Sequence, residues 1–539
     1  MRAFARPDHA LPSEHLFRGR LVARVHTGGH RILRDHFELG DSENPGRKAM
    51  PPFDIHLVQT GDYLVPTLRG PLPGERGAWN LFVLPGKIWQ EAGDRGYSRA
   101  SLPFSLQEKN SNCTHNGMMS FLFRGDGAVS YLAYQVSSET CYYYQADMWG
   151  LMKLDYFPGP VADEEAVVAG FEREISSRMP TRPIRQLEVD YPGIESVQFS
   201  STRALDPEHV TLYGFVIDGV NYLGGCQTRH GPYPFCDMLV LPSYSLAKSL
   251  FVGLGLMRLE RKWPGAARES IAGLVESCAR NGNWEDVTLA DLADMTTGNF
   301  QSADYEVDES SSHFSDFNAA TLHRDKIELA CDHFPRRAAP GSRWVYHSSD
   351  SYIASSAFDN YLARQSGEQS DFFADILLAD IWRPLGLSPT SEFPLRTQDS
   401  LAKAYAYNGL SFLADDIAKL SNFLNAGRGR VNSQSIFDEA LFEAAMQRSN
   451  EIRGIDTSLA TYRYSTGFWG LTTGMCEKEM RYAFMSGYGG INVALFPNGS
   501  SYYVFSDNKQ FDLQAPAMIS HRIRSFCDPH FTSPLPASN

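Results

Sequence analysis

The chain has 539 residues, of which 43% are hydrophobic and 21% charged, and these ordinary proportions predict a folded protein with at least one large core. Its 49 Lys and Arg against 63 Asp and Glu give a formal net charge of −14, which argues against sequence-independent nucleic-acid binding, because such binding needs clustered basic side chains. The longest apolar runs, such as residues 249–257, are far shorter than the about 20 residues of a membrane-spanning helix, so we expect no membrane span.

The first part of the chain, residues 15–160, is rich in short strand patterns bounded by Gly, Pro and Asn, which predicts a sandwich or barrel. The strand-like runs are residues 53–58, 79–84, 118–123, 129–134 and 142–150. An amphipathic helix is expected over residues 163–178, and the prolines that follow it are typical of a linker. We therefore divide the chain near residue 190, within about ten residues, into a β-rich N-terminal domain with its linker helix (1–190) and a second domain (191–539).

The eight cysteines bear on the cellular compartment. Cys226 and Cys236 lie close together in a Gly- and Pro-rich loop, and Cys113 and Cys141 flank two strand-like runs. Either pair suits a disulfide in an exported protein or free thiols in a cytosolic one. The first residues lack an apolar run, so we expect no signal peptide in this form of the chain. A periplasmic or secreted location is slightly favoured over a cytoplasmic one.

The second domain has a different sequence pattern, with both helices and strands expected. A strand is expected over residues 210–217, with a tight turn at Asp218–Gly219. Helices are then expected over residues 245–262, 266–280, 351–366, 371–382 and 415–425, and strands over residues 466–471, 482–485, 491–496 and 502–506. A helical block between two groups of strands predicts an α+β fold with one antiparallel sheet flanked by helices.

One motif, Ser-x-x-Lys, indicates nucleophilic catalysis. Ser245 and Lys248 are three residues apart at the start of a helix that is apolar nearly all round, so both side chains share one face of a buried helix. Burial lowers the pKa of a lysine, and a neutral amine can take the proton from a serine that is otherwise a weak nucleophile. The alternative is structural: the serine caps the helix and the lysine reaches out to solvent. The other Ser-x-x-Lys matches, Ser400 with Lys403 and Ser506 with Lys509, lie in polar or strand-end contexts.

Further landmarks follow in order along the chain. They are Pro340-Gly-Ser-Arg-Trp-Val-Tyr-His-Ser before a helix, Pro384-Leu-Gly-Leu-Ser-Pro, Asn408-Gly-Leu-Ser-Phe-Leu-Ala-Asp-Asp, and Phe484-Met-Ser-Gly-Tyr-Gly-Gly with Phe496-Pro-Asn-Gly after it. With the Ser-x-x-Lys helix, this order resembles the serine β-lactamase and penicillin-binding-protein-like superfamily, in particular class C β-lactamases, family VIII carboxylesterases and 6-aminohexanoate-dimer hydrolases. The resemblance covers about residues 200–525 and implies a β-lactamase-like catalytic domain with an all-helical subdomain.

The resemblance assigns roles to individual residues. It makes Ser245 the acylated nucleophile, Lys248 the group that helps to deprotonate it, and Tyr346 the proton shuttle of a Tyr-x-Asn motif. Here that motif contains His347 and Ser348, so a serine stands where the family has asparagine. A hydroxyl can still donate and accept a hydrogen bond, and we expect both residues to contact the substrate.

The third family motif, Lys-Thr-Gly or His-x-Gly on a strand at the edge of the site, matches Met485, Ser486 and Gly487. The resemblance implies that these residues contact the substrate and that the backbone N–H groups of Ser245 and Tyr488 form the oxyanion hole. Because methionine replaces the cation of the motif, we expect a neutral ester or amide rather than a strongly anionic substrate.

The first hypothesis is therefore a Ser-Lys-Tyr hydrolase acting on a small ester or amide, including a linear oligoamide. A non-catalytic relative that binds a peptide or glycan, and a β-lactamase or D,D-peptidase, stay open as alternatives. No cofactor is expected. His26, His30 and His36 lack carboxylates at metal-ligand spacing, so no metal site is expected either. The sequence leaves the oligomeric state open.

Overall fold

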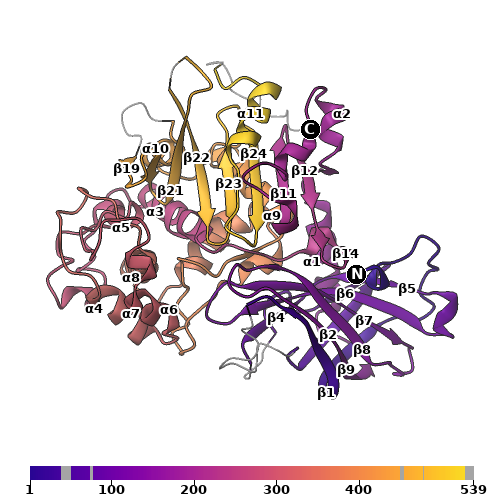
Figure 1. Ribbon diagram of the computed structural model, residues 1–539. Helices are drawn as coiled ribbons and strands as arrows, with labels where there is room; N and C mark the ends of the chain where they lie inside the picture. The colour runs from indigo at the N-terminus through magenta and orange to yellow at the C-terminus, as the bar shows by residue number, and fades with distance from the viewer. Residues whose placement is uncertain (38–49, 73–76, 449–453, 478, 528–539) are drawn as a thin grey trace.

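The computed structural model describes residues 1–37, 50–72, 77–448, 454–477 and 479–527, and two large sheets dominate it (Figure 1). The first sheet belongs to the N-terminal part of the chain, and the second belongs to the C-terminal part with its helices. The α+β class predicted from the sequence is confirmed. Among the described residues, no helix is both long and apolar enough to span a membrane.

The first sheet has nine antiparallel strands in the order β4-β6-β5-β3-β2-β1-β9-β8-β7, and an additional pairing of β6 with β7 closes it on itself. Its strands are β1 (Arg18–Asp35), β2 (Phe53–Thr60), β3 (Tyr63–Pro66), β4 (Trp79–Val83), β5 (Gly86–Trp89), β6 (Ser98–Glu108), β7 (Thr114–Phe123), β8 (Leu132–Thr140) and β9 (Ala146–Pro158). A separate apolar core fills it. The runs predicted over 53–58, 79–84 and 118–123 are strands, whereas 129–134 and 142–150 become strands only in part.

The second sheet also has nine strands, in the order β10-β12-β11-β24-β23-β22-β21-β20-β19, and all pairs are antiparallel except β10 with β12. Its strands are β10 (Thr181–Pro183), β11 (Val210–Ile217), β12 (Val220–Gly225), β19 (Ile455–Asp456), β20 (Tyr462–Ser465), β21 (Phe468–Thr473), β22 (Met480–Gly487), β23 (Ile491–Leu495) and β24 (Ser501–Ser506). Strands therefore occur at every place where the sequence predicted them after residue 200. Short two-stranded pairs join β13 (Gln227–Thr228) to β14 (Gly231–Pro232), β15 (Leu241–Pro242) to β16 (Ser411–Phe412), and β17 (Arg430–Val431) to β18 (Gln434–Ser435).

Helices cover the second sheet and form a lobe beside it (Figure 1). The α-helices are α1 (Glu164–Ser176), α2 (Gln186–Asp190), α3 (Leu254–Lys262), α4 (Glu276–Ala279), α5 (Leu289–Ala293), α6 (Ser312–Ala319), α7 (His323–Asp332), α8 (Ser348–Ser366), α9 (Ala414–Leu424), α10 (Glu439–Ala445) and α11 (Gln514–Ile523). Two π-helices, η7 (Lys248–Gly253) and η10 (Phe373–Trp382), stand where α-helices were expected. The largest apolar core lies between these helices and one face of the sheet.

One predicted helix is wrong. Residues 266–280 form only η8 (Ala266–Arg268) and α4, with a bridge residue, Ser270, and a turn between them. The backbone N–H of Ile271 donates to Val287 O at 2.9 Å, and Ser270 pairs with Thr288. This pairing with a distant segment replaces the local bonds that a continuous helix would make.

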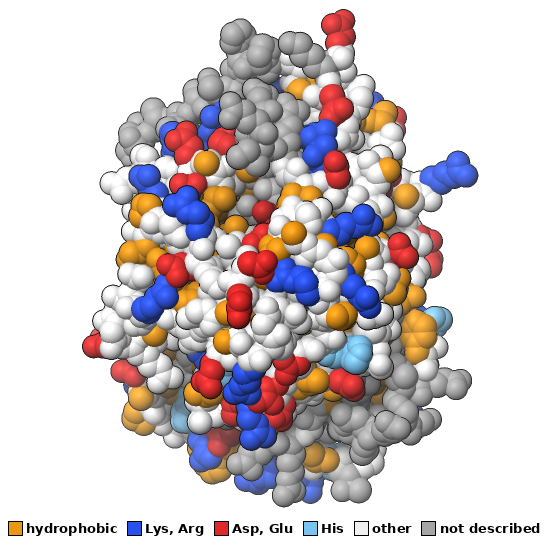
Figure 2. Space-filling model, turned by 90° about the vertical axis from the view of Figure 1, so that its left-hand side faces the viewer, with side chains coloured by type: hydrophobic (Ala, Val, Ile, Leu, Met, Phe, Trp, Pro, Cys, Tyr) orange, Lys and Arg blue, Asp and Glu red, His pale blue; other side chains and the backbone are white. Residues whose placement is uncertain are grey.

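The change from the first sheet to the second falls between residues 158 and 181, because β9 ends the first sheet and β10 already pairs with the second. We keep the division into 1–190 and 191–539 as a proposal. All eight cysteines form disulfides. The two pairs named in the sequence analysis are both bridged, and two further bridges use the remaining cysteines. The four bridges are Cys113–Cys141, Cys226–Cys236, Cys278–Cys331 and Cys476–Cys527. Figure 2 shows one face of the molecule, where acidic and basic side chains are interspersed.

Candidate active site

A cavity of about 400 Å³ opens where the two parts of the chain meet. Two of its lining residues come from loops of the first sheet, Ser111 between β6 and β7 and Tyr143 between β8 and β9, and the others come from the second part. These others are Tyr244, Ser245, Tyr305, Glu306, Glu309, Ser310, Phe314, Asn318, Tyr346, Ser348, Tyr407, Asn408, Trp469, Ser486, Gly487, Tyr488 and Lys509. The cavity is therefore lined by the predicted nucleophile, and both parts of the chain contribute residues to its walls.

Ser245 and Lys248 meet at the start of the long helical segment. The ammonium of Lys248 donates to Ser245 Oγ at 2.8 Å, as the three-residue spacing leads one to expect. Lys248 is also the first residue of η7, and π-helical turns are often found at functional sites. Two further acceptors complete its contacts: Ser348 Oγ at 2.9 Å and Tyr407 O at 3.4 Å.

Lys248 is only 2% exposed. Burial lowers the pKa of its amine to about 8, although the carboxylates of Glu309 and Asp350 pull in the opposite direction. A lysine of ordinary pKa holds its proton at neutral pH, whereas this one releases it close to neutrality. The neutral amine is thus accessible beside the Ser245 hydroxyl.

Tyr346 completes a group of three. Burial raises the pKa of its phenol well above the usual value, and a hydrogen bond with Ser245 opposes this effect. The Lys248 amine lies 4.8 Å from the centre of the Tyr346 ring. Because the phenol keeps its proton, Tyr346 is suited to give a proton, and Lys248 is the better candidate for taking one.

A half-buried carboxylate at the cavity lies close to the lysine, and the sequence analysis did not identify it. Ser348, at the first position of α8, donates from its hydroxyl to Glu309 Oε2 at 2.6 Å and from its backbone N–H to Glu309 Oε1 at 2.7 Å. Burial raises the pKa of Glu309, and the charge of Lys248 lowers it. Ser348 therefore links Lys248 to Glu309 through hydrogen bonds on both sides. Glu309 lies in a polar Asp-Glu-Ser-Ser-Ser run, which has the composition of a surface loop and gave no sequence signal.

The structure does not bring His347 to the cavity. Its ring is 1% exposed, stacks on Phe334 at 4.2 Å between centroids, and places Nε2 2.9 Å from Asp308 Oδ2. Burial alone would lower the pKa of His347, but the hydrogen bond with Asp308 and the nearby charges of Asp350 and Glu309 raise it to about 9. His347 is thus a buried cation in an ion pair rather than a substrate contact.

The end of β22 forms one wall of the cavity. Ser486, Gly487 and Tyr488 line it. A Cβ atom at Gly487 would lie 2.7 Å from Ser243 O, so glycine is needed for the strand to approach the nucleophile so closely. Met485 is 1% exposed and packs in the core, because successive side chains of a strand point to opposite faces. The structure therefore does not bring Met485 to the cavity either.

A cation does reach the cavity from another element. Lys509, just after β24, lines it, and its amine lies 4.5 Å from the centre of the Tyr142 ring and 5.0 Å from that of Tyr488. The expectation of a neutral substrate rested on Met485, and Lys509 now provides a positive charge at the same cavity. Within the described residues, no group of three or more His, Cys, Asp or Glu side chains is arranged to hold a metal ion.

Comparisons with known proteins add the following. No family model matches the chain, and no curated protein matches it. Solved structures that are similar include a protein of Bacillus anthracis described as a 6-aminohexanoate-dimer hydrolase, which is 16% identical with a TM-score of 0.43 over 64% of this chain and 80% of that one. A penicillin-binding protein of Bacillus halodurans is 14% identical with a TM-score of 0.43 over 63% and 98%, and a mutant class C β-lactamase is 10% identical with a TM-score of 0.41 over 67% and 98%. These names fall within the superfamily whose motifs the sequence resembles, but likeness this distant carries no argument about function, which rests on the site itself.

Proposed function

We propose that this chain is a serine hydrolase that cleaves a small ester or amide, including a linear oligoamide, through an acyl-enzyme on Ser245. One observation carries the proposal: the Lys248 amine lies 2.8 Å from Ser245 Oγ, at a lysine that is almost wholly buried and has a pKa lowered to about 8. A hydroxyl that faces an amine able to lose its proton near neutral pH is an activated nucleophile.

Acylation begins with the attack of Ser245 Oγ on the substrate carbonyl carbon, while its proton passes to the neutral amine of Lys248. The carbonyl oxygen becomes an oxyanion, which would accept hydrogen bonds from the backbone N–H groups of Ser245 and Tyr488 at the cavity wall. Tyr346 then gives its proton to the departing alcohol oxygen or amine nitrogen, and Lys248 restores it. A water molecule hydrolyses the acyl-enzyme by the same proton transfers in reverse and releases the acid.

The size and lining of the cavity support a small substrate. Its volume of about 400 Å³ suits a molecule of small-ligand size, and the rings of Tyr305 and Trp469 offer apolar surface. Lys509 favours an acyl or leaving group that carries a carboxylate, which keeps the β-lactamase or D,D-peptidase alternative open. Nitrocefin turnover tests that alternative directly.

The decisive experiment is covalent labelling with a fluorophosphonate, read by intact-protein mass and followed by turnover of a p-nitrophenyl ester. We expect a single mass gain on Ser245, lost together with turnover in Ser245→Ala. Ser400→Ala is the matched control, because Ser400 belongs to another Ser-x-x-Lys match and is exposed. Labelling of Ser245→Ala at the wild-type rate would overturn the proposal, and absence of any mass gain in the wild type would favour the non-catalytic binding protein.

We also propose an oxidising compartment for this chain, periplasmic or extracellular. Its four disulfides use every cysteine, and such bridges persist where thiols are not kept reduced.

A further inference from the structure

The residue before the nucleophile has an unusual backbone. Tyr244 has a φ of +40°, in the left-handed region that residues with a side chain seldom adopt. Such conformations persist only where the surroundings hold them, and they cluster at functional sites. Because Tyr244 immediately precedes Ser245, its backbone determines where the Ser245 hydroxyl and N–H point.

A side chain of the first sheet holds this turn. Asn112, between β6 and β7, is 0% exposed, and its Oδ1 accepts hydrogen bonds from Tyr244 N at 2.7 Å, Gly409 N at 3.0 Å and Ser243 Oγ at 3.2 Å. The Asn112 amide nitrogen has no hydrogen-bond partner within the described residues. The carboxamide oxygen is therefore the atom through which Asn112 acts.

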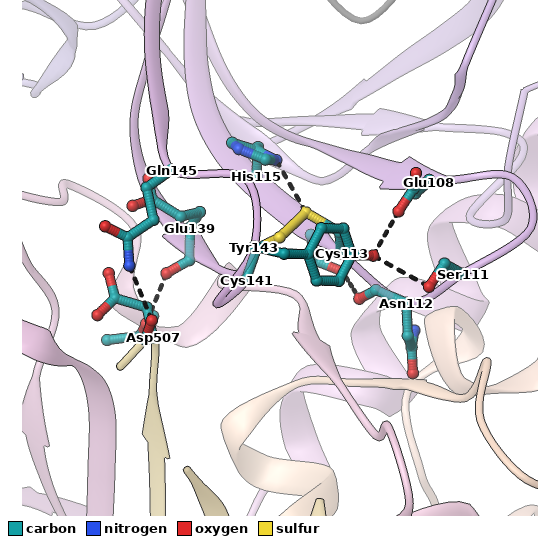
Figure 3. Close-up of a disulfide and its surroundings, with 12 residues drawn as sticks. Glu108, Ser111, Asn112, Cys113, His115, Glu139, Cys141, Tyr143, Gln145 and Asp507 are labelled. Carbon is teal, nitrogen blue, oxygen red and sulfur yellow. Dashed lines mark hydrogen bonds between the residues drawn. A yellow bond between two sulfur atoms is a disulfide. The ribbon is translucent and has the colours of Figure 1, made fainter. Parts of the chain in front are cut away.

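The segment that carries Asn112 is itself fixed on both sides. Cys113 is bonded to Cys141, and the hydroxyl of Tyr143, two residues after Cys141, donates to Glu108 and is hydrogen-bonded to the hydroxyl of Ser111 (Figure 3). The disulfide and these hydrogen bonds link residues 108–113 to residues 141–143, and we call the two linked segments the bracket. Neither segment can move independently of the other. Because Ser111 and Tyr143 also line the cavity, the bracket is part of the site.

We propose that Asn112 is a positioning residue for the reaction on Ser245, supplied by the N-terminal sheet. Its oxygen holds the Tyr244 turn in the conformation that directs the Ser245 hydroxyl to Lys248 and keeps the Ser245 N–H at the cavity wall. The inference rests on the proposed function, and it makes the nucleophile dependent on a domain that does not contain it. A displacement of about 1 Å at a reacting atom can cost about 100-fold in rate, which sets the size of the effect.

The test compares Asn112→Leu with Asn112→Asp. Leucine keeps the approximate shape and removes the acceptor, whereas aspartate keeps an acceptor at the same place. Asn116→Leu is the matched control, because Asn116 is also 0% exposed and also bridges the two parts of the chain, through Val240 N at 3.0 Å and Val240 O at 2.9 Å. It touches neither the Tyr244 turn nor the cavity.

The readouts are the rate of fluorophosphonate labelling of Ser245, kcat and KM for a p-nitrophenyl ester at the pH of maximal rate, and the thermal midpoint. We expect Asn112→Leu to lose about 100-fold in labelling rate and kcat with KM little changed, and Asn112→Asp to recover to within about 10-fold of the wild type. Asn116→Leu should lose thermal stability but keep the wild-type labelling rate.

Two outcomes overturn the inference: folded Asn112→Leu that labels at the wild-type rate, or Asn116→Leu slowed as much as Asn112→Leu. If Asn112→Leu does not fold, Asn112→Ser moves the acceptor oxygen away from the turn with a smaller change, because the serine side chain is shorter. Labelling of Asn112→Ser must then be slower than that of Asn112→Asp for the inference to stand. A wild-type protein that does not label at all refutes the proposed function instead, so the two failures are distinguishable.

Discussion

Replacing Glu309 by glutamine should move the pH dependence of the reaction in a defined direction. Glu309 accepts two hydrogen bonds from Ser348, whose hydroxyl in turn accepts from Lys248. Its carboxylate stabilises the ammonium form of Lys248 and so raises the pKa of that amine, against the larger effect of burial. Glutamine keeps an acceptor for Ser348 but removes the charge, so the pKa of Lys248 should fall.

The size of the effect follows from the geometry. Burial and the nearby charges take the pKa of Lys248 from 10.5 to about 8, which corresponds to about 3 kcal/mol against the ammonium. With a pKa of about 8, only about one lysine in ten is neutral at pH 7. Two unit charges about 5 Å apart interact by about 3 kcal/mol at an effective dielectric constant of about 20, so losing one of them can lower the pKa by about two. The neutral fraction at pH 7 should then rise to at least about one half.

The assay is kcat/KM for a p-nitrophenyl ester measured between pH 5 and 10. In the wild type we expect the rate to fall on the acid side with an apparent pKa of about 8. In Glu309→Gln this fall should occur about two pH units lower, whatever the maximal rate. Asp304→Asn, which removes an exposed charge from the same segment, is the control and should leave the profile in place. An acid limb that stays at about pH 8, or moves upward, in Glu309→Gln refutes the role assigned to Lys248.

The remaining predictions concern the neighbouring groups. Tyr346→Phe should lower kcat/KM by about 100-fold or more with an unchanged thermal midpoint, because it removes only the transferable proton, and retention of half the rate would contradict this. The pKa of His347 is raised to about 9 in the folded protein, so the pair with Asp308 stabilises fully below the unfolded pKa of about 6.5 and loses this effect as pH rises through 9. Asp308→Asn should therefore cost at most about 3 kcal/mol at pH 6, because Asp350 and Glu309 also raise this pKa, and much less at pH 10 in urea unfolding. An equal loss at both pH values would refute the ion pair. Lys509→Met should lower kcat/KM about 3-fold for an ester that carries a carboxylate and leave a neutral ester unaffected, and an equal change for both would exclude the charge as the cause.

What could be predicted from the sequence is what local spacing determines. Ser245 and Lys248 meet because three residues on a helix bring side chains to one face, and the turn at Asp218–Gly219 joins β11 to β12 because both residues take positive φ, +51° and +75°. Tyr346 is assigned through the family resemblance, and the Pro-Gly that precedes it and the helix that follows it support the match. These signals are short-range, so they remain visible in one sequence without any alignment.

The rest of the site depends on contacts between distant segments. Asn112 reaches Tyr244 across 132 positions, and Glu309 reaches Ser348 across 39, so nothing near either residue indicates its partner. The same holds for residues 266–280, where pairing with a remote segment prevents the continuous helix that the local pattern favours. The expectation for Met485 failed for a related reason: the strand was recognised, but not which of its two faces borders the cavity.

The order of strands in the second sheet has a consequence for synthesis. β11 begins at Val210 and pairs with β24, which ends at Ser506. A strand that is synthesised early can therefore complete its pairing only after a strand that is synthesised late. While the ribosome is still building the intervening segment, β11 has an open edge and the wall that carries Tyr488 does not yet exist. If the proposed function holds, we expect a nascent polypeptide that already contains Ser245, Lys248 and Tyr346 to be inert until its final strands emerge. We also expect a C-terminal truncation before Ser506 to expose an edge prone to aggregation.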